Sequence, residues 1–443
     1  MKSICCAIAA FAALAACGQT AEDANEDSTD EASGGTGGSA FPSESLPFLD
    51  GDAARKVGAP NEHGECPTGV ATLQIDGVEE ILREPAEKRR SIRLAEDLCG
   101  GLVVARERAG VVRVERFSLD GTRFASSDTR ETFLTEKSPN GYLGALGVSR
   151  TGAAVVQTWN PPGATLDIFQ ADGSGIDGTD VGDTEMASSL VERPNGSWIF
   201  FDHQITVLSL PSQTIEDGRQ HFGFYSPTGD MMDFNTPGVL VPGQDQWFVA
   251  SWRRYNDGAR IGASYCLPTR WPQCERAFSD QSATPPAALT LSAASASHAI
   301  LGVTRRDQNE FLEQLNWTQS KDSVCLSFVA EVGADQWRWS PDRCDLIVGA
   351  HAIEFDTIVL HFEWTGTAWV PWLTRLSRIG EVRDSVSLAD AIPDLNPFFN
   401  ATGFNQRSVD SVLPAKGDVM TIAGLEKDGG NFWVGRFNWR SMF

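Results

Sequence analysis

The 443-residue sequence lacks an excess of basic residues. It has 36 Lys and Arg against 59 Asp and Glu, which gives a formal net charge of -23. Nucleic-acid binding by counterion release needs the opposite balance, so no nucleic-acid partner is expected. A long hydrophobic run is also missing. The apolar stretch from Ile4 to Ala16 is too short to cross a bilayer as a helix, which takes about 20 residues.

Signatures of catalysis are equally scarce. No Gly-x-Ser-x-Gly motif is present, and the nearest approach, Gly173-Ser174-Gly175, lacks the spacing of a nucleophile elbow. The sequence therefore predicts no serine hydrolase, and it singles out no catalytic residue and no required cofactor.

The N-terminus predicts an exported protein. A charged start and the apolar run form a secretory signal. The run ends in Leu14-Ala15-Ala16-Cys17, which resembles the bacterial lipobox, where small residues precede a lipidated cysteine. The resemblance implies cleavage after Ala16, a diacylglycerol anchor on Cys17 and a place in the cell envelope. Gly18 stands where Asp would favour the inner membrane, so we expect the outer membrane. An ordinary signal peptide that happens to carry Cys17 is the alternative.

Three parts of the chain follow from this pattern. Residues 1–16 are the signal peptide, and residues 17–40 are the lipidated cysteine with an acidic, Gly-rich linker that has no large apolar side chain. Such a linker cannot offset the entropy of ordering, so we expect it to be a disordered spacer. Residues 41–443 then form a single domain.

Six cysteines follow Cys17, an even number in an oxidising compartment where disulfides persist. Proximity in sequence favours three pairs: Cys66 with Cys99, Cys266 with Cys274, and Cys325 with Cys344. Free buried thiols are the alternative for each pair.

The folded part predicts an all-β protein. Apolar residues alternate, or come in short aromatic and β-branched runs broken by Gly, Pro and Asp. Helical exceptions are expected only at Ala86 to Arg93 or Leu388 to Ile392. A unit recurs in which a strand of small residues, a tight turn and an aromatic-rich strand follow one another. Its turn markers are Gly110, Gly152, Gly196, Gly243, Ser297, Glu354 and Gly417, about 40 to 65 residues apart.

This repeat favours a β-propeller of seven blades. Inner strands near the axis accommodate small residues, and second strands bury the bulky ones, including Trp159, Trp198, Trp247, Trp252 and Trp364. The strand Val70 to Ile75 has no blade of its own, so we expect it to close the ring beside Phe432 to Trp439. Six or eight blades, or a pair of β-sandwiches, are the alternatives.

Two short segments resemble known propeller repeats. Residues 224–235, Phe-Tyr-Ser-Pro-Thr-Gly-Asp-Met-Met-Asp-Phe-Asn, resemble the delta-60 repeat, and Thr365-Gly366-Thr367-Ala368-Trp369 is similar to an element of quinoprotein-like blades. Each match occurs once, whereas members of those families repeat it in every blade. The resemblance therefore implies the fold and carries no activity over.

Several polar groups are candidate sites. His351, Glu354, Asp356, His361 and Glu363 form the one cluster that contains histidine, and a structural role is favoured over metal binding or acid/base chemistry. The loop from Asp172 to Asp183 suggests calcium, although Ile176 stands where an oxygen ligand is needed. Lone histidines and arginines beside aromatic residues have the same structural interpretation. They are Asp202-His203, His221, Trp252-Arg253-Arg254-Tyr255 and Trp337-Arg338-Trp339.

The tether and the missing motifs favour a scaffold or binding module for a protein or polymer partner. The alternative is a hydrolase or lyase acting on glycans or phosphate esters, with a site assembled from several blades at the mouth of the channel. Converging carboxylates or histidines at that mouth would favour the enzyme, and an exposed apolar patch would favour the binding module.

Overall fold

The fold is described from a computed structural model. It describes residues 60, 65–68, 75–86, 91–108, 111–128, 142–160, 163–172, 175–180, 189–201, 204–209, 214–221, 237–255, 258–267, 274–282, 286–305, 327–333, 336–341, 345–365, 367–397, 409–414, 417–427 and 430–443. The chain divides into Met1–Glu44 and Ser45–Phe443, and all described residues belong to the second unit. The expected anchor at Cys17 and the domain boundary at residue 41 lie outside them.

The described residues form strands and one short 3-10 helix, η2 (Trp439–Met442). The strands are β1 (Val78–Pro85), β2 (Ile92–Glu96), β3 (Leu102–Arg108), β4 (Val111–Phe117), β5 (Arg123–Asp128), β6 (Tyr142–Val148), β7 (Ala154–Asn160), β8 (Gly163–Phe169), β9 (Gly175–Asp180), β10 (Ser189–Glu192), β11 (Ser197–Phe201), β12 (Gln204–Ser209), β13 (Thr214–His221), β14 (Gly238–Leu240), β15 (Trp247–Tyr255), β16 (Gly258–Cys266), β17 (Cys274–Ser282), β18 (Pro286–Ser295), β19 (His298–Arg305), β20 (Phe328–Val332), β21 (Arg338–Trp339), β22 (Asp345–Ala352), β23 (Asp356–Trp364), β24 (Trp369–Ser377), β25 (Val382–Ser387), β26 (Val409–Val412), β27 (Val419–Leu425) and β28 (Asn431–Asn438).

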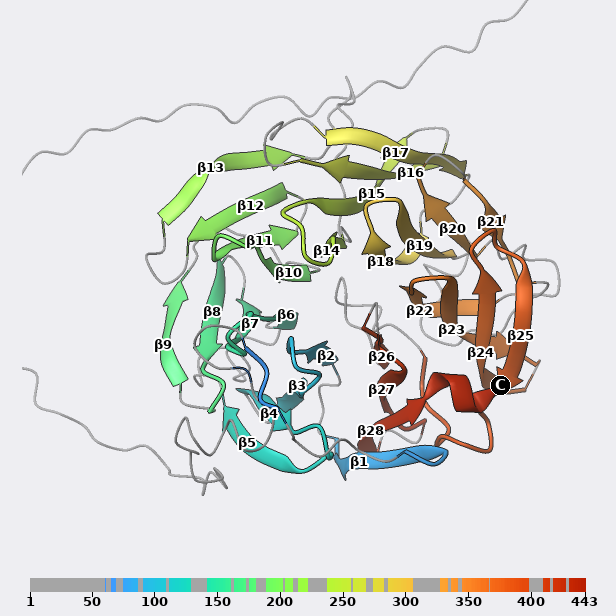
Figure 1. Cartoon of the computed structure of the whole chain (residues 1–443), viewed down its shortest axis with the longest axis horizontal. Helices are drawn as coiled ribbons and strands as arrows, with labels where there is room; N and C mark the ends of the chain where they lie inside the picture. Colours follow the sequence, from blue (N-terminus) through green and yellow to red (C-terminus); the bar gives the residue numbers. More distant parts are fainter. Residues whose placement is uncertain are drawn as a thin grey trace, which may run out of the picture. The chain divides into compact units, whose positions relative to one another are not determined.

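These strands make seven four-stranded antiparallel sheets, and within Ser45–Phe443 the sheets are arranged radially around one axis (Figure 1). Six sheets use four consecutive strands, beginning with β2, β6, β10, β14, β18 and β22. The innermost strand of each sheet contacts that of the next, and β26 contacts β2, which completes the ring. The predicted all-β propeller fold is confirmed.

The seventh sheet joins the two ends of the domain. Its order is β26-β27-β28-β1, so the strand that comes first in the domain is the outermost strand of the last sheet. β1 runs antiparallel to β28 from the pair Val78↔Phe437 to the pair Pro85↔Asn431. Closure by an N-terminal strand was predicted, but the position was wrong. Ile75 lies outside any strand, and the closing strand begins at Val78.

Hydrophobic contacts reinforce this closure. Leu82 of β1 belongs to a buried cluster that includes Phe432 and Val434 of β28 and Ile92 and Leu102 of the first sheet. Burying a leucine side chain stabilises the fold by roughly 1.5–3 kcal/mol. β1 therefore holds the last sheet against the first.

Hydrogen bonds also tie innermost strands to their neighbours. The backbone N–H of Leu94 donates to Asp410 at 2.8 Å, and that of Ala352 donates to Ser292 at 2.9 Å. Similar bonds join Arg93 to Gly144, Ser189 to Gly238 and His351 to Ser411. Polar groups near the axis are thus used to hold one sheet to the next.

Most sequence markers fall where the repeat places them. Gly152, Gly196 and Gly243 lie in turns between first and second strands, with positive φ values that favour glycine. The tryptophans predicted for second strands all lie on second strands, namely β7, β11, β15 and β23. Gly110 was a wrong marker, because it lies in the connection from β3 to β4, one strand too late.

Neither expected helix is present in the described residues, and residues 87–90 lie outside them. Ile92–Glu96 is strand β2, and its partner β3 satisfies the backbone that a helix would have used. Residues 388–392 make turns in which Ile392 N–H donates to Leu388 O, and Pro393 follows at once. A residue before proline is disfavoured in the helical conformation, so the helix is not extended.

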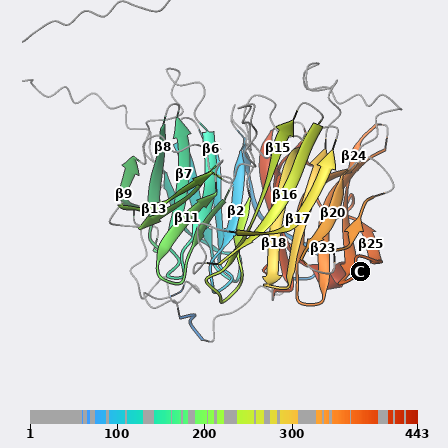
Figure 2. The ribbon, with the colours of Figure 1, turned by 90° about the horizontal axis from the view of Figure 1, so that it is seen from above.

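Each sheet has two ends, which define two rims of the propeller (Figure 2). The turn rim carries the turns between first and second strands and between third and fourth strands. The connection rim carries the links from second to third strands and from one sheet to the next. Among the residues that the structure describes, no helix is long and apolar enough to span a membrane.

Candidate functional site

The structure does not bring the histidine-bearing cluster into one site. His351 is buried on β22, and its Nε2 lies 2.9 Å from Ser411 Oγ on β26. Burial lowers the pKa of His351 to about 4, so the ring is neutral and serves as a hydrogen-bonding group between two sheets. Glu354 is exposed on the turn before β23.

His361 belongs to a separate chain of hydrogen bonds within one sheet. Its Nδ1 bonds Asp345 on β22, and its Nε2 lies 2.8 Å from Thr374 Oγ1 on β24. Thr374 in turn lies 2.8 Å from Ser385 Oγ on the exposed edge of β25. Asp345 was missed in the sequence, because it is close to His361 only through the pairing of two strands. Glu363, the partner expected on the same strand, lies opposite Asp345 in the pairing of β22 with β23.

Asp356 has a third, unrelated environment. Its buried carboxylate accepts hydrogen bonds from Arg375 at 2.7 and 2.9 Å, and Arg383 lies 3.3 Å away. Within the described ranges, no group of three or more His, Cys, Asp or Glu is arranged to hold a metal ion. The hydrogen bonds of His351, His361 and Asp356 link strands of the sixth sheet to one another and to the seventh sheet.

The segment Asp172 to Asp183 is not one continuous loop as expected, because Gly175–Asp180 forms strand β9 and pairs with β8. Calcium binding by this segment stays a prediction. The rest of that segment after Asp172 lies outside the described residues. Asp202-His203 also lies outside them, as does the side chain of His221 on β13.

The arginines beside aromatic residues are used in packing where they are described. Arg338 stacks over Phe328, with its Cζ 3.9 Å from the ring centroid, and lies 3.6 Å from Asp280 of the neighbouring sheet. Trp252 is partly buried against the core, whereas the side chains of residues 253–255 lie outside the described part.

Two predicted disulfides are present. Cys66 pairs with Cys99 in the turn between β2 and β3, and Cys266 pairs with Cys274 across β16 and β17. Cys325 and Cys344 lie outside the described residues, so their pairing stays a prediction.

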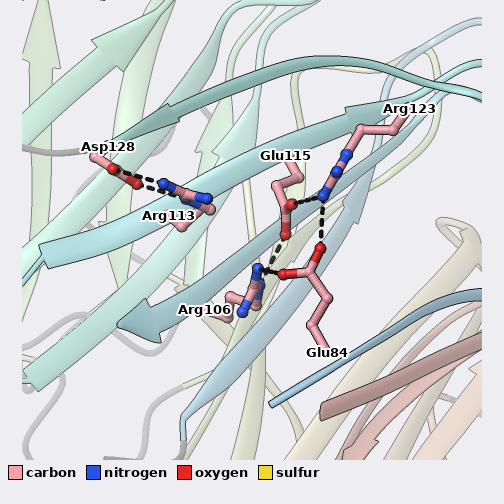
Figure 3. A network of polar contacts seen from close by, with 6 residues as sticks. All are labelled: Glu84, Arg106, Arg113, Glu115, Arg123 and Asp128. Carbon is pink, nitrogen blue, oxygen red and sulfur yellow. Dashed lines mark hydrogen bonds and ion pairs between the residues drawn. The ribbon is translucent and has the colours of Figure 1, made fainter. Parts of the chain in front are cut away.

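A network of charges crosses the closure between β1 and the first sheet (Figure 3). Arg106 and Arg123 alternate with Glu84 and Glu115 in a closed ring of ion pairs. Arg106 and Glu115 are almost fully buried. Burial opposes the charge of Glu84, but Arg106 and Arg123 outweigh it and hold the pKa of Glu84 below its usual value. This charge-balanced ring joins β1, which belongs to the seventh sheet, to the first sheet.

A second group of charges, in which Asp97 and Arg436 are buried and Glu96 is partly buried, lies between β2 and the seventh sheet. Glu96, at the end of β2, accepts a 3.5 Å hydrogen bond from Thr421, which accepts another from Arg436. Burial raises the pKa of Glu96 to about 8, with Arg436 opposing the shift. Burial also raises the pKa of neighbouring Asp97. No sequence pattern indicated this pair, because its environment is made by strands more than 300 residues away.

The exposed large apolar side chains of the described part lie on one rim. They are Leu98, Phe355, Ile379, Val382 and Phe443, with exposed fractions from 38 to 67%. All five occupy the turn rim of three adjacent sheets, in turns, at the first residue of β25 or at the C-terminus. We call these five residues the apolar sector.

The chain enters the domain on the same rim. Buried Pro60 lies against Gly152, where a Cβ atom would stand 2.9 Å from the proline ring. Cys66 is then bonded to Cys99, next to Leu98. Pro60 and Cys66, which precede β1, therefore both lie on the turn rim, at the second and the first sheet.

No protein-family model and no curated protein sequence matches the chain. Among solved structures, the chain is similar to virginiamycin B lyase from Staphylococcus aureus, with 8% identity, a TM-score of 0.48, and coverage of 81% of this chain and 99% of the lyase. It is also similar to part of the tricorn protease, with 10% identity, a TM-score of 0.46, and coverage of 84% and 35%. A third similar structure is part of prolyl oligopeptidase B from Galerina marginata, with 6% identity and a TM-score of 0.47. The match covers 79% of this chain and 49% of the oligopeptidase. Likenesses this distant carry no argument about activity.

Proposed function

We propose that this chain is a lipid-anchored propeller of the cell envelope, in the outer membrane, that acts as a scaffold or binding module for a protein or polymer partner. The observation that carries the proposal is the entry of the chain on the turn rim, at Pro60 and Cys66. An anchor at Cys17 then turns this rim toward the membrane and the connection rim away from it.

The sequence of the connection rim supports binding. The links between β13 and β14, between β19 and β20 and between β25 and β26 contain aromatic residues, among them Tyr225, Trp317 and Phe404. Large aromatic side chains dominate binding energy at protein interfaces. Tyr225, Trp317 and Phe404 lie outside the described residues, so this support comes from their sequence and their position between strands.

The test has two arms in cells that make the full chain. A fatty-acid label should appear on the protein and disappear in Cys17→Ser. A photo-crosslinking amino acid at Tyr225 should capture one discrete partner, whereas the same group at Gln244, on the turn rim, should not. An unlabelled Cys17, or crosslinks that are the same from both rims, would contradict the proposal.

One observation favours the alternative of a hydrolase or lyase acting on glycans or phosphate esters. Glu96 lies at the end of an innermost strand, and a carboxyl group with a pKa of about 8 is a proton donor at neutral pH. Turnover of chromogenic glycosides or phosphate esters that is lost in Glu96→Gln would support the enzyme. If neither the glycosides nor the phosphate esters are turned over, the result would favour the binding module over the enzyme.

A further inference from the structure

The apolar sector differs from the equivalent positions around the ring. Leu98 and Phe355 are 62% exposed at the tips of turns between first and second strands. The same turns of the second to fifth sheets carry small or polar residues at their tips, namely Thr151, Asn195, Gln244 and Ser297. Among the turn-rim residues that the structure describes, large exposed apolar side chains therefore occur on one side of the ring.

The position of the anchored end bears on what covers this sector. Residues 18–59 connect the expected anchor to Pro60, and a random-coil chain of that length would span roughly 35 Å root mean square. The disulfide from Cys66 holds the entering chain beside Leu98. A membrane that holds Cys17 is thus within reach of the sector at all times, and the tether raises its effective concentration there.

The chemistry of the sector fits a lipid surface. Ile379 is 67% exposed at a turn tip, and exposed Arg378 precedes it, so an apolar side chain stands beside a guanidinium group that can bond to lipid phosphates. Side chains at separate turn tips can each enter the boundary between headgroups and acyl chains. The net charge of -23 gives no general attraction to anionic lipids, so the contact must be mainly apolar.

We propose that the apolar sector lies against the bilayer that holds the lipidated Cys17. This inference rests on the proposed function, because it takes the anchor as given. The propeller then lies on the membrane by the side of its turn rim that comprises the sixth, seventh and first sheets, with the other sheets raised from it.

The test compares hydrogen exchange in two states of the full-length protein. One is the lipidated chain in protein-free phosphatidylcholine vesicles, and the other is the Cys17→Ser chain in solution. Amides in the turns at Leu98, Phe355 and Ile379 should exchange several-fold more slowly on vesicles. Amides in the turns at Asn195 and Gln244 should be unchanged. High salt should leave the protection in place, since salt screens charges and not apolar contacts.

A surface variant separates contact from folding. The lipidated double variant Phe355→Ser, Ile379→Ser should lose the protection on vesicles while its Tm stays the same, because both side chains are exposed. The matched control Gln244→Ser should keep it. Equal exchange in both states, or equal protection around the whole rim, would overturn the inference. Protection seen only on native membranes would overturn it in favour of a protein partner.

The experiment distinguishes a missing lipid anchor from a missing contact between the apolar sector and the membrane. A purified chain that does not float with vesicles contradicts the anchor and with it the proposed function. A chain that floats but shows no protected turns contradicts only the contact of the apolar sector with lipid.

Discussion

At the scale of single residues, buried ionisable groups gather where one sheet meets the next. Glu96 and Arg436 face each other across the closure, and His351 joins the sixth sheet to the seventh. Burial shifts the pKa of each group away from its usual value, and a pKa that differs between folded and unfolded states makes stability depend on pH. Two residues therefore give predictions of opposite sign.

Glu96 should destabilise the fold as pH rises. Its pKa is about 8 in the folded protein against 4.5 in the unfolded chain, so the folded state holds the proton more tightly. The stability present below pH 4.5 is lost as pH rises toward 8. Glu96→Gln should raise the Tm above pH 8 and leave it unchanged near pH 4.5, whereas Glu354→Gln, on an exposed turn, should change neither. Equal shifts at both pH values would refute the role of burial.

His351 should act in the other direction. Its pKa is about 4 in the folded protein against 6.5 in the unfolded chain, so the stability present above pH 6.5 is lost as pH falls toward 4. His351→Gln keeps a donor for Ser411 and removes the titration. The difference in Tm between variant and wild type should therefore move in favour of the variant between pH 6.5 and 4. A constant difference over that range would contradict the assignment.

At the scale of elements, much of the propeller was predictable from local chemistry. Gly152, Gly196 and Gly243 mark turns because only glycine readily takes their positive φ, and this signal is independent of the rest of the fold. β2 was missed although its turn ends in Gly100, whose positive φ is the same signal, because residues up to Arg93 were expected to be helical and Gly110 was taken as the turn marker. The pairing of Ile92–Glu96 with β3 outweighs local propensity.

The candidate sites were less predictable for a related reason. Asp345 meets His361 through strand register, and Glu84 reaches Arg106 only after the first strand of the domain has joined the last sheet. Sequence patterns report which residues share one strand face, but not which strands become neighbours across the closure. The disulfides were predictable because both pairs are close in sequence.

Removing a buried carboxylate from the ring of ion pairs at β1 should lower the free energy of unfolding strongly. Glu115 is fully buried and accepts from Arg106 and Arg123 at 2.8 and 2.7 Å. Glu115→Gln leaves a buried arginine short of its counter-charge and should cost about 3–5 kcal/mol in the free energy of unfolding. Asp418→Asn, which breaks the exposed pair with Arg440, should cost about 1 kcal/mol or less. Chemical denaturation would measure both, and equal costs would argue against a buried ring.

At the scale of the whole molecule, the two disulfides should contribute differently to the free energy of unfolding. The pair Cys66–Cys99 closes a loop with a sequence separation of 33, and Cys266–Cys274 one of 8. Loop-closure entropy predicts losses of about 4 and about 2.5 kcal/mol when each pair is replaced by serine. Denaturation of the two double variants would show whether the pair that fastens the entering chain matters more. The reverse order would mean that the chain before β1 contributes little to the domain.

The central claim is that the ring is held closed by β1, which pairs with β28 and carries Leu82 and Glu84 into the seam with the first sheet. The most direct measurement is thermal unfolding of a chain that lacks Val78–Pro85, beside a control that lacks residues 18–44. The control should unfold like the wild type, in one transition at the same Tm. Loss of β1 should lower the Tm of the whole domain and broaden the transition, because the first and last sheets are no longer joined. If the chain without β1 unfolds at the wild-type Tm, the closure described here is wrong.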